Sequence, residues 1–379
     1  MEFDISWVLW GLPLAFVLGW AASRFDLRQM RLENRQAPKA YFKGLNFLLN
    51  EQQDQAIDAF IEAVQNDPDT SELHFALGNL FRRRGEYERA VRVHEHLLSR
   101  GDLSGSDRHR AQYALALDYL KAGLLDRAEE ALHKLEGTPF EAQARLDLLA
   151  NYERSRDWAL AATVAERLMS AGQGVFNNRL SHYLCEQAAE AQPEQAQKLL
   201  RLAILKAPDA ARPRLDMARL LTDSGQTRDA LLMLEDALVQ APVSIPLIVC
   251  PFADLAIATG QIEDALIRLE TIYTLMPSLD VLDAIVMLAE HVHDTTARDW
   301  YVRHLEHEPS LVAATRWIAG EKLEHEQFHP QVQRALDHAV KPLLRYRCAA
   351  CGFETKQHFW QCPGCQTWDS YPARRVEEL

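Results

Sequence analysis

Four of the six cysteines lie near the C-terminus in two C-x-x-C pairs, Cys348 with Cys351 and Cys362 with Cys365. Each pair can form a tight turn in which two thiolates face one ion while backbone N–H groups donate to sulfur. Two such turns make a tetrahedral four-thiolate site, closed to water and therefore structural. The spacing therefore predicts that these four cysteines bind one metal ion.

Zinc is the expected metal and iron is the alternative, because nothing else in the chain indicates the electron partners that a redox iron would need. The spacer between the pairs has ten residues, too few for a core of its own. Apolar support must come from nearby aromatic residues or from docking onto the preceding helices. The aromatic candidates are Phe353, Phe359, Trp360, Trp368 and Tyr371. Cys185 and Cys250 stand alone in helical patterns and are expected to be small core residues.

A second metal motif is weaker. His325-Glu326-Gln327-Phe328-His329 matches H-E-x-x-H, in which two histidines on one helical face bind zinc in proteases. Pro330 follows at once, and the residue before a proline is disfavoured in a helix. No third ligand stands nearby, and no nucleophile elbow or phosphate-binding glycine loop occurs elsewhere. We therefore expect a protein that is not an enzyme.

The elements that must carry the ribbon are helical, because apolar residues recur at helical spacing from about residue 39 to residue 280. A small alanine recurs at intervals of 34, 38, 33, 35, 34 and 35 residues. This period is typical of the tetratricopeptide (TPR) unit, a helix-turn-helix. The recurring residues are Ala56, Ala90, Ala128, Ala161, Ala196, Ala230 and Ala265.

Other positions keep the same phase. Five residues before the alanine, Gly85, Gly123, Gly225 and Gly260 stand where a left-handed backbone ends the first helix. Units four and five lack this glycine and are the weaker units. The pattern predicts an all-α fold, a TPR superhelical solenoid of about seven units over residues 37–279. Degenerate units or capping helices follow over 280–343, and a four-cysteine ribbon over 344–379.

Such arrays form a concave groove lined by the first helix of each unit, and the groove binds peptides or helices of other proteins. Asn79 with Arg82 faintly resembles a clamp for a C-terminal carboxylate. The residues expected to line the groove are Tyr41, Phe75, Asn79, Arg82, Tyr113, Leu117, Leu215 and Arg219.

The N-terminus predicts a membrane anchor over residues 1–23, because nineteen residues from Ile5 to Ser23 carry no charge. A cleaved signal peptide is the alternative, but it needs a positive segment before the apolar run. Here the positive charges follow the run, in a basic linker over residues 24–36. The positive-inside rule then places the N-terminus in the periplasm and the rest of the chain in the cytoplasm.

The formal net charge of -13 argues against nucleic-acid binding.

An anchor, a TPR array and a terminal rubredoxin-type ribbon, in this order, resemble the lipopolysaccharide assembly protein B family of Gram-negative bacteria. The resemblance is carried by the charge-free stretch Trp7–Trp20, by Ala56–Phe60, by His74–Glu86 and by Tyr346–Cys365. Arg347 stands before the first cysteine, as in the family pattern.

The resemblance implies an adaptor at the cell inner membrane. Members act with an FtsH-type membrane protease to destroy the deacetylase that commits precursor to lipopolysaccharide synthesis. They are also thought to hold other lipopolysaccharide assembly proteins near the membrane, so a structural scaffold that gathers enzymes without promoting proteolysis is the alternative. The sequence does not decide between a monomer and a homodimer.

Overall fold

The computed structural model describes residues 16–17, 20, 42–66, 70–294, 296–321 and 326–379. The predicted linker and Tyr41 lie outside these residues. So does the predicted anchor, apart from Phe16, Val17 and Trp20. The chain divides into two compact units, one ending at Asp157 and the other running from Trp158 to Leu379.

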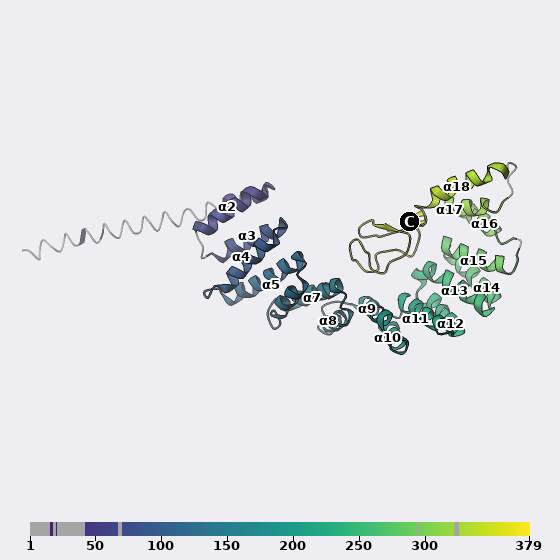
Figure 1. Ribbon diagram of the computed structural model, residues 1–379, viewed down its shortest axis with the longest axis horizontal. Coiled ribbons are helices and arrows are strands. Elements are labelled where there is room, and N and C mark those ends of the chain that lie inside the picture. The colour runs from purple at the N-terminus through teal and green to yellow at the C-terminus, as the bar shows by residue number, and fades with distance from the viewer. Residues whose placement is uncertain (1–15, 18–19, 21–41, 67–69, 295, 322–325) are drawn as a thin grey trace, which may run out of the picture. The chain divides into compact units, whose positions relative to one another are not determined.

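Both units are built from short helices that follow one another in the chain and pack on their neighbours (Figure 1). In the first unit, residues 42–49 are helical. They are followed by α2 (Gln53–Asn66), α3 (Ser71–Arg83), α4 (Tyr87–Ser99), α5 (Gly105–Ala122), α6 (Leu125–His133) and α7 (Glu141–Ser155).

The second unit begins with helices of the array and ends in the four-cysteine ribbon. Its helices are α8 (Trp158–Ser170), α9 (Asn177–Glu190), α10 (Pro193–Lys206), α11 (Arg212–Asp223), α12 (Thr227–Gln240), η1 (Pro242–Ser244), α13 (Ile245–Thr259), α14 (Ile262–Leu275), α15 (Leu279–His291), α16 (Asp299–His307), α17 (Leu311–Ile318), η2 (Glu326–Phe328), α18 (His329–Val340) and η3 (Val376–Glu378). Its strands are β1 (Tyr346–Arg347) and β2 (Glu354–Thr355).

The repeat predicted from the alanines is confirmed. All seven alanines are buried, each in the second of two consecutive helices. Where both helices of a pair lie in one unit, only a small side chain at this position lets them approach closely. In the second repeat, Gly78 on α3 faces His94 on α4. A Cβ on Gly78 would lie 2.5 Å from the His94 ring, so this crossing requires glycine.

The turns explain why the two weaker units still form. In the fourth repeat Arg156 adopts the left-handed backbone (φ 60°) that glycine supplies elsewhere. In the fifth, Pro193 in the first turn of α10 fixes a new helix start without a left-handed residue. The segment between the second and third repeats is a short connection. Ser104 caps α5 by accepting from the Asp107 N–H at 3.1 Å, so the helix already begins at Gly105.

Two further repeats occupy the region after residue 280. Pro277-Ser278-Leu279 recurs as Pro309-Ser310-Leu311, 32 residues later. Each serine caps the helix that follows, α15 or α17, by accepting a backbone N–H in the first turn. Helices α15 and α16 therefore form the eighth repeat, and α17 and α18 belong to the ninth.

Among the described residues, one stretch, Pro242–Thr259, is long and apolar enough to cross a membrane by length and composition alone. Its helix α13 packs against α12, α14 and α15 and buries Ile248, Val249 and Phe252. The first helix of a repeat is apolar all round when it is enclosed on several sides, and in this it resembles a membrane-spanning helix. This stretch therefore gives only weak support for a membrane location.

Candidate metal centre and the surface that holds it

The four cysteines predicted to bind metal come together at one point. Their Sγ atoms all lie within 4.8 Å of one another. Cys348 Sγ is 3.8 Å from Cys365 Sγ, and Cys351 Sγ is 3.7 Å from Cys362 Sγ. Metal–sulfur bonds of about 2.3 Å in a tetrahedron require sulfurs roughly 3.8 Å apart. The residues therefore fit a single four-thiolate ion, and zinc and iron both suit this donor set.

Each pair is held by a tight backbone turn. At the first, the Gly352 N–H donates to the Cys348 carbonyl at 2.9 Å, and Gly352 has the positive φ (76°) that this turn requires. Antiparallel pairing of β1 with β2 closes the turn from outside, with Tyr346 opposite Thr355. At the second, the Gln366 N–H donates to the Cys362 carbonyl at 2.8 Å.

Hydroxyl groups around the sulfurs favour the thiolate form. Burial alone would raise the pKa of Cys348, but the Ser370 hydroxyl, 3.3 Å from its Sγ, and backbone N–H groups lower that pKa to about 6. The Thr367 hydroxyl and backbone likewise lower the pKa of Cys365. The pKa of Cys351 is instead raised to about 12, because the backbone hydrogen bond that lowers it is outweighed by burial and the three neighbouring sulfurs. A thiolate is the metal-binding form of cysteine, so two of the four sulfurs already favour that form.

The ribbon docks on the array through Trp368. The Trp368 indole is buried and stacks on the His182 ring of α9, with ring centroids 4.8 Å apart. Trp158 and Tyr183 meet it edge-on at 5.9 Å. The apolar support that the short spacer lacks therefore comes from α8 and α9. Of the other aromatic candidates, Tyr371 is buried and Phe353 is exposed.

Polar contacts fix the orientation of this joint. His182 Nε2 donates to Asp369 in the ribbon at 2.7 Å, and His182 Nδ1 accepts from Arg212 of α11 at 3.4 Å. Arg212 is also paired with Glu186 at 2.6 Å. A cavity of about 320 Å³ remains between the ribbon and the starts of α9, α11 and α13. The ribbon thus covers the N-terminal ends of three first helices.

The groove residues predicted on the first unit have internal contacts. Arg82 of α3 donates to Asp118 of α5 at 2.9 Å and also bonds to Asn79. Asp118 in turn accepts from His94 at 2.5 Å, and both residues are fully buried. Arg82 therefore joins two repeats and already has a carboxylate partner within the chain, while Asn79 accepts from Arg82 on the same helix.

Two more of these residues bind neighbouring side chains. Phe75 is buried beneath the Arg110 guanidinium, 4.1 Å from the ring centroid. The half-buried Tyr113 donates to Asp147 of α7 at 2.7 Å. Burial and this hydrogen bond raise the pKa of the Tyr113 phenol. Leu117 is half-buried on α5.

The remaining predicted groove residues lie on α11 in the second unit, where Leu215 is half-buried and Arg219 is exposed. Tyr41 is outside the described residues. The groove assignment stays a prediction, and Arg219 is the member whose charge is most available to a partner. Its guanidinium lies 3.4 Å from the Asp216 carboxylate.

The second metal motif does not lie on one described helix. Glu326–Phe328 form a short 3-10 turn, and His329 begins α18 with Pro330 in its first turn. The His329 Nε2 lies 3.1 Å from the Ile318 carbonyl, which occupies one ring nitrogen. His325 lies outside the described residues.

Comparison with known proteins agrees with this arrangement. Residues 346–371 match the family model described as a rubredoxin metal binding domain. Lipopolysaccharide assembly protein B of Escherichia coli (strain K12) is 29% identical, and the alignment covers 97% of this chain and 98% of that protein. The chain resembles lipopolysaccharide assembly protein B over nearly its whole length. The protein of that name from Haemophilus influenzae is 28% identical over 95% of this chain and 96% of its own length.

The similar solved structures include tetratricopeptide repeat proteins. A tetratricopeptide repeat protein from Parabacteroides merdae has a TM-score of 0.35 at 14% identity, covering 67% of this chain and 99% of its own. The TPR2AB domain of yeast Sti1 also has a TM-score of 0.35, at 18% identity, covering 70% and 96%.

Sequence reasoning names Trp368 as a candidate support but misses the polar pair that orients the docked ribbon. His182 and Asp369 are 187 positions apart, and no periodicity links them. The charged C-terminus after Tyr371 has the composition of a solvated tail. One signal was available: the repeated Pro-Ser-Leu places α15 and α17, on which that tail docks.

Proposed function

We propose that the chain is an inner-membrane adaptor that regulates lipopolysaccharide synthesis by binding proteins. In this proposal it brings the committed-step deacetylase to an FtsH-type membrane protease for degradation. It has no catalytic site of its own. The observation that carries the proposal is the resemblance to lipopolysaccharide assembly protein B across the array and the ribbon together.

The architecture supports binding over catalysis. Helical repeats present long surfaces to extended or helical partners. The metal-ligand cluster found among the described residues has four cysteines and leaves no open position for substrate. The ion, when bound, supplies four bonds that hold the two turns together. Trp368, His182 and Asp369 then fix that ribbon on α9.

The membrane address rests on the N-terminal sequence. A chain confined to the membrane meets membrane-bound partners at a high effective concentration. The proposed topology has a single span, a periplasmic N-terminus and a cytoplasmic array. A reporter fused to the C-terminus should then be active in the cytoplasm, and deletion of residues 1–23 should weaken function without unfolding the array.

Partner capture tests the adaptor role. The full chain carrying Arg219→Glu should recover less protease or deacetylase from membranes. If Arg219 is a central contact, the affinity of the chain for that partner should fall about thirtyfold. Arg228→Glu makes the same charge change on α12, a second helix, where the side chain is also exposed. That control should capture partners normally. Equal capture by both variants and the unaltered chain would remove Arg219 from the groove.

Deacetylase abundance separates the adaptor from the scaffold. Depletion of the chain should raise the deacetylase level if the chain promotes proteolysis. Normal deacetylase levels, with loss of co-purifying synthetic enzymes, would instead favour the scaffold.

A catalytic role has its own test. Glu326 would be the general base of a zinc protease, so Glu326→Ala should abolish function if the chain is such an enzyme. We expect Glu326→Ala to be silent. Loss of function in a folded, metal-loaded variant would overturn the adaptor proposal.

A further inference from the structure

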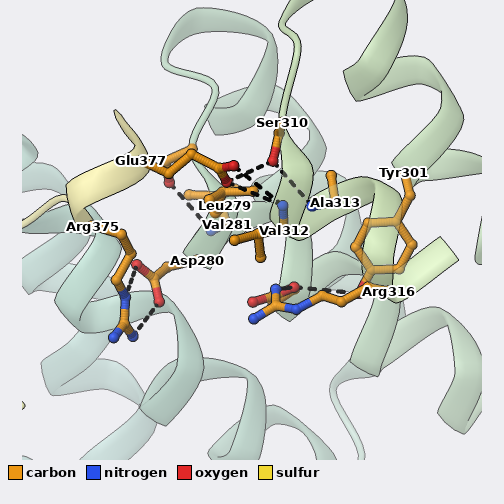
Figure 2. A network of polar contacts seen from close by, with 12 residues as sticks. Leu279, Asp280, Val281, Tyr301, Ser310, Val312, Ala313, Arg316, Arg375 and Glu377 are labelled. Atoms are coloured by element: carbon orange, nitrogen blue, oxygen red, sulfur yellow. Dashed lines mark hydrogen bonds and ion pairs between the residues drawn. The ribbon is translucent and has the colours of Figure 1, made fainter. Parts of the chain in front are cut away.

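The last residues of the chain are bound tightly to the array. Arg375 pairs with Asp280 of α15 through two nitrogens, at 2.8 and 3.1 Å (Figure 2). Asp280 is only 4% exposed, so its charge depends on this partner. Arg375 also donates to the Leu344 carbonyl at 3.0 Å and lies over the Tyr346 ring, 4.3 Å from its centroid.

The two glutamates that follow cap two helices. Glu377 accepts from the Leu311 and Val312 N–H groups at the start of α17, at 2.7 and 3.2 Å, and from the Ser310 hydroxyl at 2.8 Å (Figure 2). Glu378 accepts from the Leu279 N–H at the start of α15, at 2.9 Å. The first N–H groups of a helix have no partner within it, and a carboxylate there also meets the positive end of the helix dipole.

The two capped positions are equivalent in successive repeats. Leu279 and Leu311 each follow the capping serine of the Pro-Ser-Leu segment. Arg316 of α17 also pairs with Asp283 of α15. Asp283 in addition accepts from the Tyr301 hydroxyl at 3.3 Å (Figure 2). The tail therefore adds to contacts that already join the eighth and ninth repeats.

The same tail is joined to the ribbon at its entry. The Val376 N–H donates to the Arg345 carbonyl at 2.8 Å, and the Glu377 N–H donates to the Leu343 carbonyl at 3.2 Å. Tyr346, beneath Arg375, packs in one buried cluster with Cys348, Cys362 and Tyr371. The segment that enters the metal ribbon and the segment that leaves it are thus held side by side at α15.

We propose that Arg375–Leu379 form a latch that couples the metal ribbon to the last two repeats. When the four cysteines hold their ion, the ribbon keeps its entry and exit segments together and presents Glu377 and Glu378 to α17 and α15. Loss of the ion disorders the ribbon, the carboxylates leave, and the first turns of both helices open.

Amide hydrogen exchange on the full chain in detergent tests the latch. In the metal-loaded protein, peptides covering the first turns of α15 and α17 should be protected. The double variant Glu377→Ala/Glu378→Ala removes both acceptor carboxylates and should exchange at least tenfold faster in both peptides. Its metal content and the protection of the Cys362–Gln366 turn should stay unchanged. Glu306→Ala, which truncates an exposed glutamate of α16, is the matched control and should exchange as the unaltered chain does.

Metal removal completes the test. Chelation of the unaltered chain should speed exchange in the α15 and α17 peptides to the level of the double variant, and chelation of the double variant should add nothing there. The latch is wrong if the double variant exchanges like the unaltered chain. It is equally wrong if chelation leaves α15 and α17 protected, or accelerates them as much in the double variant as in the unaltered chain. None of these readouts depends on a partner, so the proposed function can fail or stand separately.

Discussion

Glu377 and Glu378 are adjacent in the chain, yet their carboxylates cap two different helices, α17 and α15 respectively. Both helices start with the Pro-Ser-Leu segment, which recurs after 32 residues. The two helix starts lie within hydrogen-bond reach of these two adjacent glutamates. Because Arg375 pairs with Asp280 next to Leu279, the tail binds at three points. A tail held in this way is part of the folded array.

The metal site is tested by removing single thiolates. The purified chain should carry one metal ion, and Cys348→Ser or Cys362→Ser should abolish binding because a four-thiolate site that loses one ligand is opened. Elemental analysis by mass spectrometry measures the content and distinguishes zinc from iron. Cys250→Ser, a cysteine of α13 outside the cluster, should leave the metal content unchanged. Full occupancy in both ribbon variants would contradict the assignment.

Trp368→Ala should detach the ribbon from α9. The substitution removes a buried indole that stacks on His182, and such truncations cost about 3 kcal/mol. We expect a lower melting temperature by calorimetry and faster limited proteolysis of the ribbon. Phe353→Ala removes a ribbon aromatic that is 47% exposed and should change stability far less. Equal effects of the two substitutions would argue against docking through Trp368.

Arg82→Glu should destabilise the first unit. The new carboxylate would face Asp118, which is fully buried and would lose its cationic partner. Breaking a buried ion pair costs about 3–5 kcal/mol, and like charges add to this. Thermal unfolding followed by circular dichroism measures the loss. The adjacent Arg83 is exposed, so Arg83→Glu makes the same charge change with little expected effect. If Arg82→Glu melts like Arg83→Glu, the pair contributes nothing to stability.

Acid should weaken the packing of α16 through His304. Burial lowers the pKa of this histidine below its ordinary 6.5, and the Tyr273 hydroxyl lies 2.7 Å from its Nδ1. The unfolded chain therefore binds the proton first, so the stability from the neutral ring is complete above pH 6.5 and is lost as pH falls through the lower folded value.

Melting temperatures at pH 7.5 and 5.5 measure this effect. His304→Gln should flatten the dependence on pH. His307→Gln, on the exposed side of the same helix, should preserve it. An unchanged slope in His304→Gln would show that other groups cause the acid sensitivity.

The sequence by itself determined the repeat and the cluster of four cysteines, because both depend on local spacing. A C-x-x-C pair forms its turn within a few residues. A small residue every 34 or so positions marks a helix crossing that each repeat makes with its nearest neighbour. The Pro-Ser-Leu recurrence was equally local, and it phases the last repeats once the helix starts are known.

Tertiary structure alone decided what the ribbon and tail contact. His182 meets Asp369 across 187 positions, and Glu378 meets Leu279 across 99. Such contacts depend on how the stacked helices bring distant segments together, and spacing along the chain does not encode them. Spacing along the chain is also insufficient for Arg82, whose position in the repeat predicts that it lines the groove. Only the position of α5 shows that its charge is already paired with Asp118.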